Sequence, residues 1–294
     1  MIDLHIHTTY SDGDKNITEI LKMCENKKLE YISITDHNTV KQYEDELLKN
    51  DNIFSGKIIK GVELNAVFKD KNIEILGYNI EPNTINEWCK KYYSEEKLKE
   101  QQEICYRRLL DICDKQGLKY NESQIIKPKA TRYVEISIYE ELMKHKENYK
   151  ILGEFTESLG VFFRKGLANS ESIYFVNRIE FRPKYKEVID IIHKSGGKAF
   201  LAHPFEYKFK DTIEFINDLR KEKELDGIEC FHPSANQEQR NILARYAKNN
   251  NLYISGGSDY HGSSKPDIEI GVGRGDLSIS KEILNWLYMH LVDI

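Results

Sequence analysis

Two histidines lie two positions apart in a short apolar segment near the start of the chain, where the sequence reads Ile2-Asp-Leu-His5-Ile-His7. Residues two apart in a β-strand point to the same face of a sheet, so both imidazoles could bind one cation. Asp12 follows in a Ser-Asp-Gly-Asp sequence typical of a turn, and its carboxylate could reach the same site or a neighbouring one. A His-x-His pair also occurs without any function. The interpretation therefore depends on matching ligands elsewhere in the chain.

Further imidazoles and carboxylates lie at the ends of segments whose patterns predict β-strands. The predicted strands span residues 2–7, 31–35, 58–62, 73–80, 198–202, 227–231 and 252–256. The candidate residues within or just after them are His5, His7, His37, Glu63, Glu74, His203, His232, Asp259 and His261. Because the carboxyl ends of parallel strands meet at one edge of a sheet or barrel, we expect these side chains to converge.

The types of these side chains indicate which chemistry they could perform. Many imidazoles and carboxylates with almost no thiols favour Mn²⁺, Fe²⁺ or Zn²⁺ over a structural cysteine–zinc site. So many ligands exceed the needs of one ion, whereas two or three ions sharing a bridging carboxylate would use them fully. Such clusters generate hydroxide near neutral pH and stabilise the entering and leaving oxygens of a phosphoryl displacement. The residue set therefore favours phosphoester hydrolysis.

Composition narrows the possible partners. The 294 residues carry a formal net charge of −5, which disfavours long nucleic acids and anionic membranes as partners. The apolar runs are too short to span a membrane, and the N-terminus does not read as a signal peptide. The five cysteines include no Cys-x-x-Cys pair, which fits a reducing, cytoplasmic location.

The strands must be positioned by helices, and the spacing of apolar residues predicts two kinds of region. Helices are expected at residues 17–28, 40–49, 187–194, 211–222, 236–249 and 280–291, alternating with the strands. Between them lies a charged, helix-rich block, with helices expected at 83–118, 122–127, 133–146 and 148–158. We predict an α/β barrel from residues 1–81 and 187–294, with residues 82–186 as a helical insertion over one end.

Several motifs together resemble a known family. They are His5-x-His7 with Ser11-Asp12-Gly13, Thr35-Asp36-His37, Gly61-Val-Glu63, Ala202-His203-Pro204 and Ser258-Asp259-x-His261. In this order they resemble the motifs of the PHP (polymerase and histidinol phosphatase) family, over residues 2 to about 275. The resemblance implies a distorted (β/α)₇ barrel with two or three divalent metal ions at the carboxyl ends of its strands.

The resemblance also implies which side chains bind each ion. His5, His7, Glu63 and Asp259 would bind a first ion; Glu63, Glu74 and His203 a second; and Asp12, His37 and His261 a third. Glu74 departs from the many relatives that carry histidine at this position. Either it ligates, shifting preference towards Mn²⁺ or Fe²⁺, or it turns away and leaves the second ion weak or absent.

Four further residues are candidates for supporting roles. Asp3 and Asp36 could fix imidazole tautomers, or be ordinary surface carboxylates. His232 could donate to phosphate or act as an acid near the leaving group, or be a loop histidine with no role. In similar phosphatases an arginine–histidine pair in the insertion binds a substrate phosphate. In this chain Arg132 is the nearest match, although a surface arginine and the alternatives Lys165, Arg178 and Arg182 fit equally well.

The predicted function is that of a metal-dependent phosphoric monoester hydrolase. In this reaction, metal-activated hydroxide attacks the phosphorus of a phosphomonoester in a small metabolite or nucleotide. The middle block and Ser195-Gly-Gly-Lys-Ala-Phe-Leu-Ala-His-Pro204 resemble stand-alone nucleoside-bisphosphate and nucleotide phosphatases. Alternatives are a histidinol phosphatase, an exonuclease on short oligonucleotides, and a non-catalytic metal-binding barrel. The exact substrate, the native metal and the oligomeric state stay open.

Overall fold

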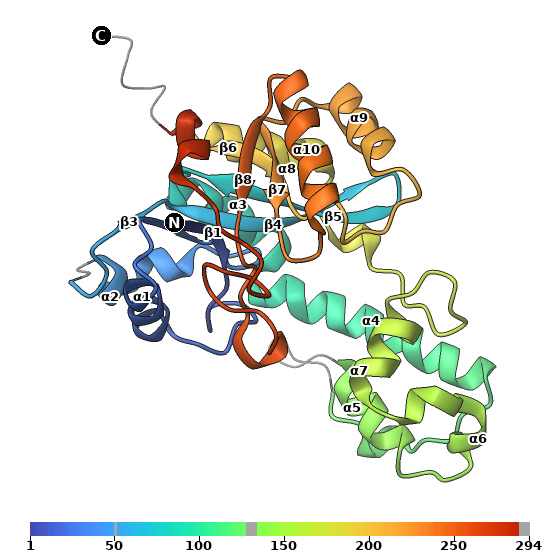
Figure 1. Cartoon of the computed structure of the whole chain (residues 1–294). Coiled ribbons are helices and arrows are strands. Elements are labelled where there is room, and N and C mark those ends of the chain that lie inside the picture. The colour runs from blue at the N-terminus through green and yellow to red at the C-terminus, as the bar shows by residue number, and fades with distance from the viewer. Residues whose placement is uncertain (50–51, 128–133, 288–294) are drawn as a thin grey trace. The chain divides into compact units, whose positions relative to one another are not determined.

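The computed structural model describes residues 1–49, 52–127 and 134–287. The chain forms two compact units, one made of Met1–Cys89 with Pro183–Ile294 and the other of Lys90–Arg182 (Figure 1). Every strand of the described residues belongs to the first unit, which has an α/β fold. The second unit is helical.

The strands form two sheets. The first sheet is parallel, with the order β1 (Ile2–Ile6), β2 (Tyr31–Ile34) and β3 (Lys57–Ile58). The second has the order β4 (Gly61–Phe68), β5 (Lys71–Tyr78), β6 (Lys198–Leu201), β7 (Gly227–Phe231) and β8 (Tyr253–Gly256). In it β5 runs antiparallel to both β4 and β6, whereas β6, β7 and β8 are parallel.

The β4–β5 hairpin corrects the predicted strand pattern. The segment predicted as one strand at 58–62 belongs to two strands, and β4 continues past Glu63 to Phe68. The two strands of the hairpin are joined by Lys69 and Asp70 alone, both with positive φ (44° and 60°). Two-residue hairpins of this type need positive φ at both positions, and their usual signature is Asn-Gly or Asp-Gly. Lys-Asp carries no such signal, so the sequence did not predict the turn.

Isolated bridges link the two sheets at the strand ends. Ile6 pairs with Tyr260 beyond β8, and His37, beyond β2, pairs with Glu63 on β4. Beside these bridges, backbone hydrogen bonds run from His7 N–H to the Tyr260 carbonyl (3.0 Å) and from Asn38 N–H to the Glu63 carbonyl (2.8 Å). Residues that follow different strands are thereby held side by side.

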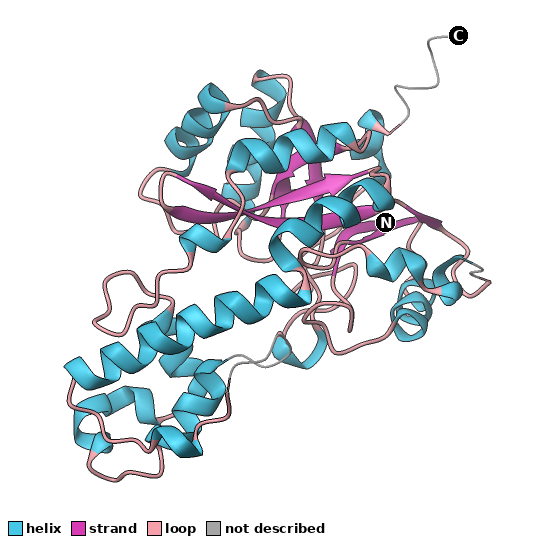
Figure 2. Ribbon diagram, turned by 180° about the vertical axis from the view of Figure 1, so that it is seen from behind, coloured by secondary structure: helices cyan, strands magenta, loops and turns pink. Residues whose placement is uncertain are grey.

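Helices flank these strands (Figure 2), and most begin where the sequence predicted. The main ones in the first unit are α1 (Ile17–Asn26), α3 (Pro82–Tyr93, which continues into the second unit), α8 (Tyr185–Lys194), α9 (Thr212–Glu222) and α10 (Gln237–Asn249). The Asn16 side chain caps α1 in a reciprocal capping box with Glu19. The predicted helix at 40–49 is instead a 3₁₀ turn, Lys41–Glu44, followed by the short α2, Glu46–Lys49. The predicted helix at 280–291 is a 3₁₀ segment, Lys281–Trp286, and its predicted end lies outside the described residues.

Apolar side chains fill the interior below the strand ends. Leu4, Tyr78, Phe200 and Trp286 are buried in one cluster, and Trp286 from the last described segment stacks on Tyr78. Burial of such large side chains supplies much of the stability of a domain. The polar residues at the strand ends are therefore supported by a closely packed apolar core.

The second unit has its own core. Its longest helix is α4 (Glu95–Lys115), followed by α5 (Val134–Leu142), α6 (Asn148–Leu152), α7 (Leu159–Val161) and single turns between them. Leu109, Ile138, Phe162 and Tyr174 are buried together. The predicted helix at 122–127 is only one 3₁₀ turn, Glu122–Gln124. None of the helices within the described part of the chain is long and apolar enough to cross a membrane.

Candidate metal centre

All nine predicted ligands converge in the first unit, together with His232. Groups whose ligand atoms lie within 4.8 Å of one another are His7–Asp12–His37–His261, His5–His7–Glu63, His37–Glu63–Glu74 and His5–His232–Asp259. His203 joins them through contacts with Glu63 and Glu74. Arg132, the predicted phosphate-binding residue of the insertion, lies outside the described residues.

At the first predicted metal position, atoms with lone pairs face one another. His5 Nε2 lies 3.1 Å from His7 Nε2, and Glu63 Oε2 lies 3.2 Å from each of them. Asp259 Oδ1 lies 3.4 Å from His5 Nε2 and 3.3 Å from His7 Nε2. Two atoms that each bind an ion at about 2.1 Å lie roughly 3.0–3.4 Å apart at octahedral or tetrahedral angles. The four side chains therefore fit a common divalent ion.

Glu63 also faces a second set of ligands with its other oxygen. Its Oε1 lies 2.9 Å from His203 Nε2, which is also 3.4 Å from Glu74 Oε2. Glu74 thus points towards the centre rather than away from it. The two oxygens of Glu63 address separate ligand sets, which is the geometry of a bridging carboxylate.

The third set lies on the far side of His7. Asp12 Oδ1 is 3.2 Å from His261 Nε2 and 3.5 Å from His7 Nδ1, while Asp12 Oδ2 is 3.7 Å from His37 Nε2. His37 Nδ1 is also 3.2 Å from Glu63 Oε2 and is buried without a hydrogen-bond partner among the described residues. Its ring therefore stands between this set and Glu63.

Two of the candidate ligands have strained backbones. His203 and Asp259 have φ values of 26° and 54°, in a region that non-glycine residues rarely adopt. Such conformations cost about 1–3 kcal/mol each and persist where the surroundings enforce them. Asp259 N–H donates to the His5 carbonyl (2.8 Å), and His203 N–H donates to Glu229 Oε2 (2.8 Å). Both side chains are thereby aimed at the centre.

Glu229 is a functional candidate that the sequence interpretation missed. It is fully buried on β7, and its Oε1 lies 2.9 Å from His5 Nδ1. A carboxylate at this distance holds the proton on Nδ1 and leaves Nε2 free to ligate. The only signal in the sequence was a carboxylate inside the apolar strand Gly-Ile-Glu-Cys-Phe.

Asp3 and Asp36 do not fix imidazole tautomers, which was one of their two predicted roles, because their hydrogen-bond partners are backbone N–H groups and hydroxyls. Asp3, fully buried, accepts hydrogen bonds from the backbone N–H groups of His5, Ser258 and Gly271 at 2.7–3.2 Å. Asp36 accepts from Thr8 N–H (2.8 Å) and from the hydroxyls of Thr8 and Ser11. Both carboxylates therefore hold the loops that carry the ligands, and neither bonds an imidazole among the described residues.

Opposite charges shift the pKa values of the buried groups. Burial lowers the pKa of His7, but the hydrogen bonds and charges of Asp259 and Glu63 outweigh it and raise that pKa to about 9. Burial also lowers the pKa of His203, but the hydrogen bond and the charge of Glu63 outweigh it and raise that pKa to about 10. Burial raises the pKa of Glu63, yet the charges of His5 and His37 hold it well below its ordinary value. Without metal, protons on the imidazoles balance the carboxylates.

His232 lies beside this centre, and its hydrogen bonds fix its tautomer. The Ser234 backbone N–H donates to His232 Nδ1 at 3.0 Å, so Nδ1 is an acceptor and the proton of the neutral ring is on Nε2. That Nε2 lies 3.2 Å from Asp259 Oδ2. His232 is thus arranged to donate a hydrogen bond rather than to ligate an ion.

Two cavities adjoin the candidate ligands. One, of about 290 Å³, is lined by candidate ligands together with Glu206, Ser264 and Lys265. The other, of about 380 Å³, is lined by His232, Ser234, Lys265 and Arg274 among others. Lys265 faces both cavities and forms an ion pair with Asp259 Oδ2. Cationic and hydrogen-bonding groups beside the centre suit an anionic substrate.

Comparison with known proteins identifies the family. The model of the PHP domain matches residues 3–254, which is most of the chain. The chain therefore belongs to the PHP domain family.

Curated relatives match along most of their length. The chain is 26% identical over 262 residues to a 5′-3′ exoribonuclease of Haemophilus influenzae, covering 88% of this chain and 89% of that protein. It is 26% identical over 278 residues to the 5′-3′ exoribonuclease Rnm of Escherichia coli, covering 92% and 87%. It is also 23% identical over 274 residues to the phosphoribosyl 1,2-cyclic phosphate 1,2-diphosphodiesterase of Eggerthella lenta, covering 88% and 94%.

Solved structures share the fold. A predicted metal-dependent phosphoesterase from Bifidobacterium adolescentis has a TM-score of 0.67 at 20% identity, with coverage of 98% of this chain and 95% of that one. An amidohydrolase from Chromobacterium violaceum, solved with bound sulfate and no metal, has a TM-score of 0.64 at 20% identity, with coverage of 89% and 88%. At these identities the likeness concerns the fold alone.

Metal affinity should depend on pH, because ions must displace the protons on His7 and His203. Their raised pKa values, about 9 and about 10, mean that both rings are protonated at pH 7 in the metal-free protein. We expect Mn²⁺ binding to tighten by about tenfold per pH unit per proton released between pH 6 and 8. Titration calorimetry in buffers of different ionisation enthalpy measures the protons released. Binding that is independent of pH, with no proton release, would contradict this arrangement.

The Glu229→Gln substitution should weaken metal binding by about 10–100-fold. The amide would donate to His5 Nδ1, which would move the ring proton to Nε2 and block the ligating nitrogen. The measurement is the Mn²⁺ dissociation constant, with circular dichroism to check folding. The matched control is Glu238→Gln, on the exposed first turn of α10. Equal affinities of the two variants would remove Glu229 from the site.

Proposed function

We propose that this protein is a metal-dependent phosphoesterase. The observation that carries the proposal is Glu63, whose two oxygens face different ligand sets at 2.9–3.2 Å. A bridging carboxylate between closely spaced ions is the arrangement of two-metal hydrolases. Membership of the PHP domain family, and the fold shared with a solved protein described as a metal-dependent phosphoesterase, agree with this proposal.

The nine converging side chains would hold two or three Mn²⁺, Fe²⁺ or Zn²⁺ ions at the three predicted positions. When bound, such ions supply hydroxide at neutral pH and neutralise phosphate oxygens. Glu63 would set the spacing of the first two positions. Glu74, as an oxygen ligand, favours Mn²⁺ or Fe²⁺ at the second.

His232 would contribute a hydrogen bond to the substrate. Its Nδ1 already accepts from Ser234, so the Nε2–H can be offered to a phosphate or leaving-group oxygen in place of Asp259. Of the two predicted roles, this tautomer favours phosphate donor over acid. Lys265, paired with Asp259, would add a positive charge at the same point.

The substrate we propose first is a phosphomonoester of a small metabolite or a nucleotide. The small cavities beside the ligands, about 290 and 380 Å³, suit a compact phosphorylated molecule. A second candidate is exonuclease action on short oligonucleotides, which the exoribonuclease relatives favour. Histidinol phosphatase is favoured by no residue. A non-catalytic barrel would be expected to lack ligands, whereas all nine are gathered in this centre.

We also propose the overall architecture that was predicted for the chain, a barrel with a helical insertion. The bridges Ile6–Tyr260 and His37–Glu63 support closure of the two sheets into a distorted (β/α)₇ barrel, with the helical unit inserted. Arg132 stays a predicted phosphate-binding residue. Two of its alternatives already pair with carboxylates, Lys165 with Glu154 and Arg178 with Glu135.

Activity should require metal and His37. The test is phosphate release with added Mn²⁺ from nucleoside bisphosphates, mononucleotides, histidinol phosphate and short oligonucleotides. We expect activity on at least one of them and a loss of kcat/KM of about 100-fold or more in His37→Ala, since a third-site ligand is removed. His145→Ala is the control, because His145 pairs with Glu141 in the helical unit. Metal-independent activity, or none on the whole panel, would contradict the proposal.

A further inference from the structure

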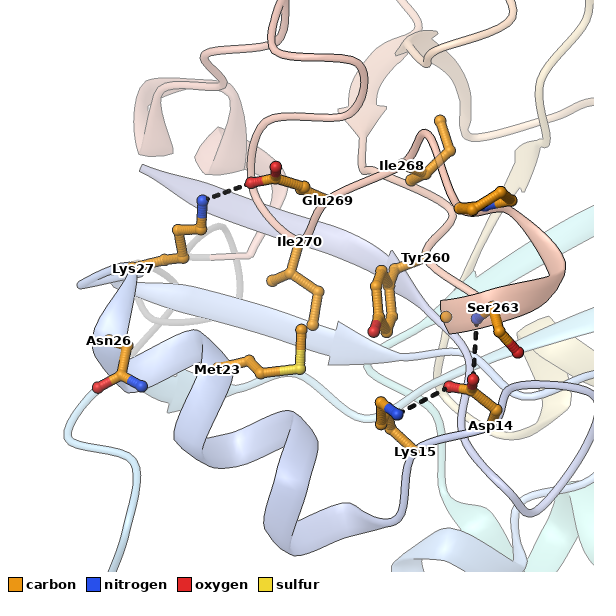
Figure 3. Close-up of a pocket in the computed structure, with 12 residues that line it drawn as sticks. Asp14, Lys15, Met23, Asn26, Lys27, Tyr260, Ser263, Ile268, Glu269 and Ile270 are labelled. Carbon is orange, nitrogen blue, oxygen red and sulfur yellow. Dashed lines mark hydrogen bonds and ion pairs between the residues drawn. The ribbon is translucent and has the colours of Figure 1, made fainter.

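A third cavity, of about 560 Å³, lies beside α1 in the first unit and shares no lining residue with the predicted ligand set. Figure 3 shows apolar side chains, among them Met23, Tyr260 and Ile270, between two charged ends. Its size and the apolar stretch between its charged ends match small-molecule sites. The short 3₁₀ helix Gly262–Ser264 separates it from the metal centre: Gly262 and Ser263 line this cavity, and Ser264 lines the cavity at the ligands.

The Tyr260 hydroxyl gives this cavity a hydrogen-bonding group among its apolar side chains. Tyr260 is 6% exposed and lines the cavity, where its ring stands among the apolar side chains (Figure 3). Its hydroxyl makes no hydrogen bond with any residue that the structure describes. The hydroxyl can therefore donate to or accept from a bound molecule. A ligand with a hydrogen-bonding edge would pair with it.

The two charged ends can accept an anion. Lys27 pairs with Glu269 at 2.8 Å at one end, and Lys15 lies 3.6 Å from Asp14 at the other (Figure 3). The Glu269 side chain is 69% exposed, and both lysines are more than a third exposed. Exposed pairs of this kind contribute little stability, so an incoming negative group can replace a carboxylate easily.

The side chains that line the cavity favour a flat aromatic ligand. The tyrosine ring and the polarisable thioether of Met23 both interact favourably with flat aromatic rings. The cavity is held in form by the neighbouring loops, because Asp14 Oδ2 accepts from Ser263 N–H at 2.8 Å. Gly262, with φ +71°, lets Asp14 approach so closely that a Cβ there would lie 1.7 Å from its oxygen. The cavity is therefore formed before any ligand binds.

We propose that this cavity binds a planar heteroaromatic anion of mononucleotide size. The ring would lie against Met23, with a heteroatom on its edge bonded to the Tyr260 hydroxyl. The negative group would pair with Lys27 or Lys15. Such a ligand can be a free nucleotide or one nucleotide unit of a longer chain, and the site does not depend on bound metal.

The test is calorimetric titration of the metal-free, chelator-treated protein with AMP and with adenosine. We expect AMP to bind one site with a dissociation constant below about 1 mM. Met23→Trp should fill the cavity and weaken AMP at least tenfold. Tyr260→Phe, which removes only the hydroxyl, should weaken both probes about 2–10-fold. At least one of the variants Lys27→Gln and Lys15→Gln should weaken the binding of AMP but not of adenosine. Lys22→Gln, an exposed position of α1 that does not line the cavity, is the matched control.

Absence of AMP binding, or AMP binding that Met23→Trp and Tyr260→Phe leave unchanged, would overturn the proposal. The protein carries no metal in this experiment, so its result is independent of phosphoesterase activity. A pentanucleotide RNA that displaces AMP would identify the ligand as part of a longer chain. Failure of the RNA to compete, with AMP still bound, would identify a free nucleotide.

Discussion

The fold is arranged around buried carboxylates that face several imidazoles at the strand ends. Glu63 and Asp259 are almost fully buried, and each faces several imidazoles within 3.4 Å. Burying an ion without compensation costs several kcal/mol, so these carboxylates require either protonated histidines or metal ions beside them. The strained backbones of His203 and Asp259, and the carboxylates of Asp3 and Glu229, hold the ligands in this arrangement.

Most of the ligand set could be predicted because its positions follow local patterns. A short β-rich run followed by a histidine or an aspartate is visible in one sequence, as at His37, His203 and Asp259. The expected convergence at the carboxyl ends of parallel strands holds only in part, because β5 returns antiparallel through a two-residue turn at Lys69 and Asp70. Glu63 and Glu74 nevertheless reach the centre from within β4 and β5, since side chains on one face of the hairpin point the same way.

Contacts between distant segments could not be predicted. Glu229 lies 224 positions from His5, and no periodicity relates the two. The tautomer of His232 depends on the backbone N–H of Ser234, which becomes visible only once the loop is folded. Lys265 and Tyr260 stood beside recognised ligands, yet nothing in their spacing indicates that one faces the metal centre and the other a separate cavity.

The measurement that tests the account most directly is anomalous diffraction from Mn²⁺-loaded crystals, with the bound metal counted by elemental analysis. We predict at least two ions per chain, about 3.5–4 Å apart, with one oxygen of Glu63 on each. The first should also contact His5, His7 and Asp259, and the second His203 and Glu74. Fewer than one ion per chain, or ions bound away from Glu63, would contradict the account.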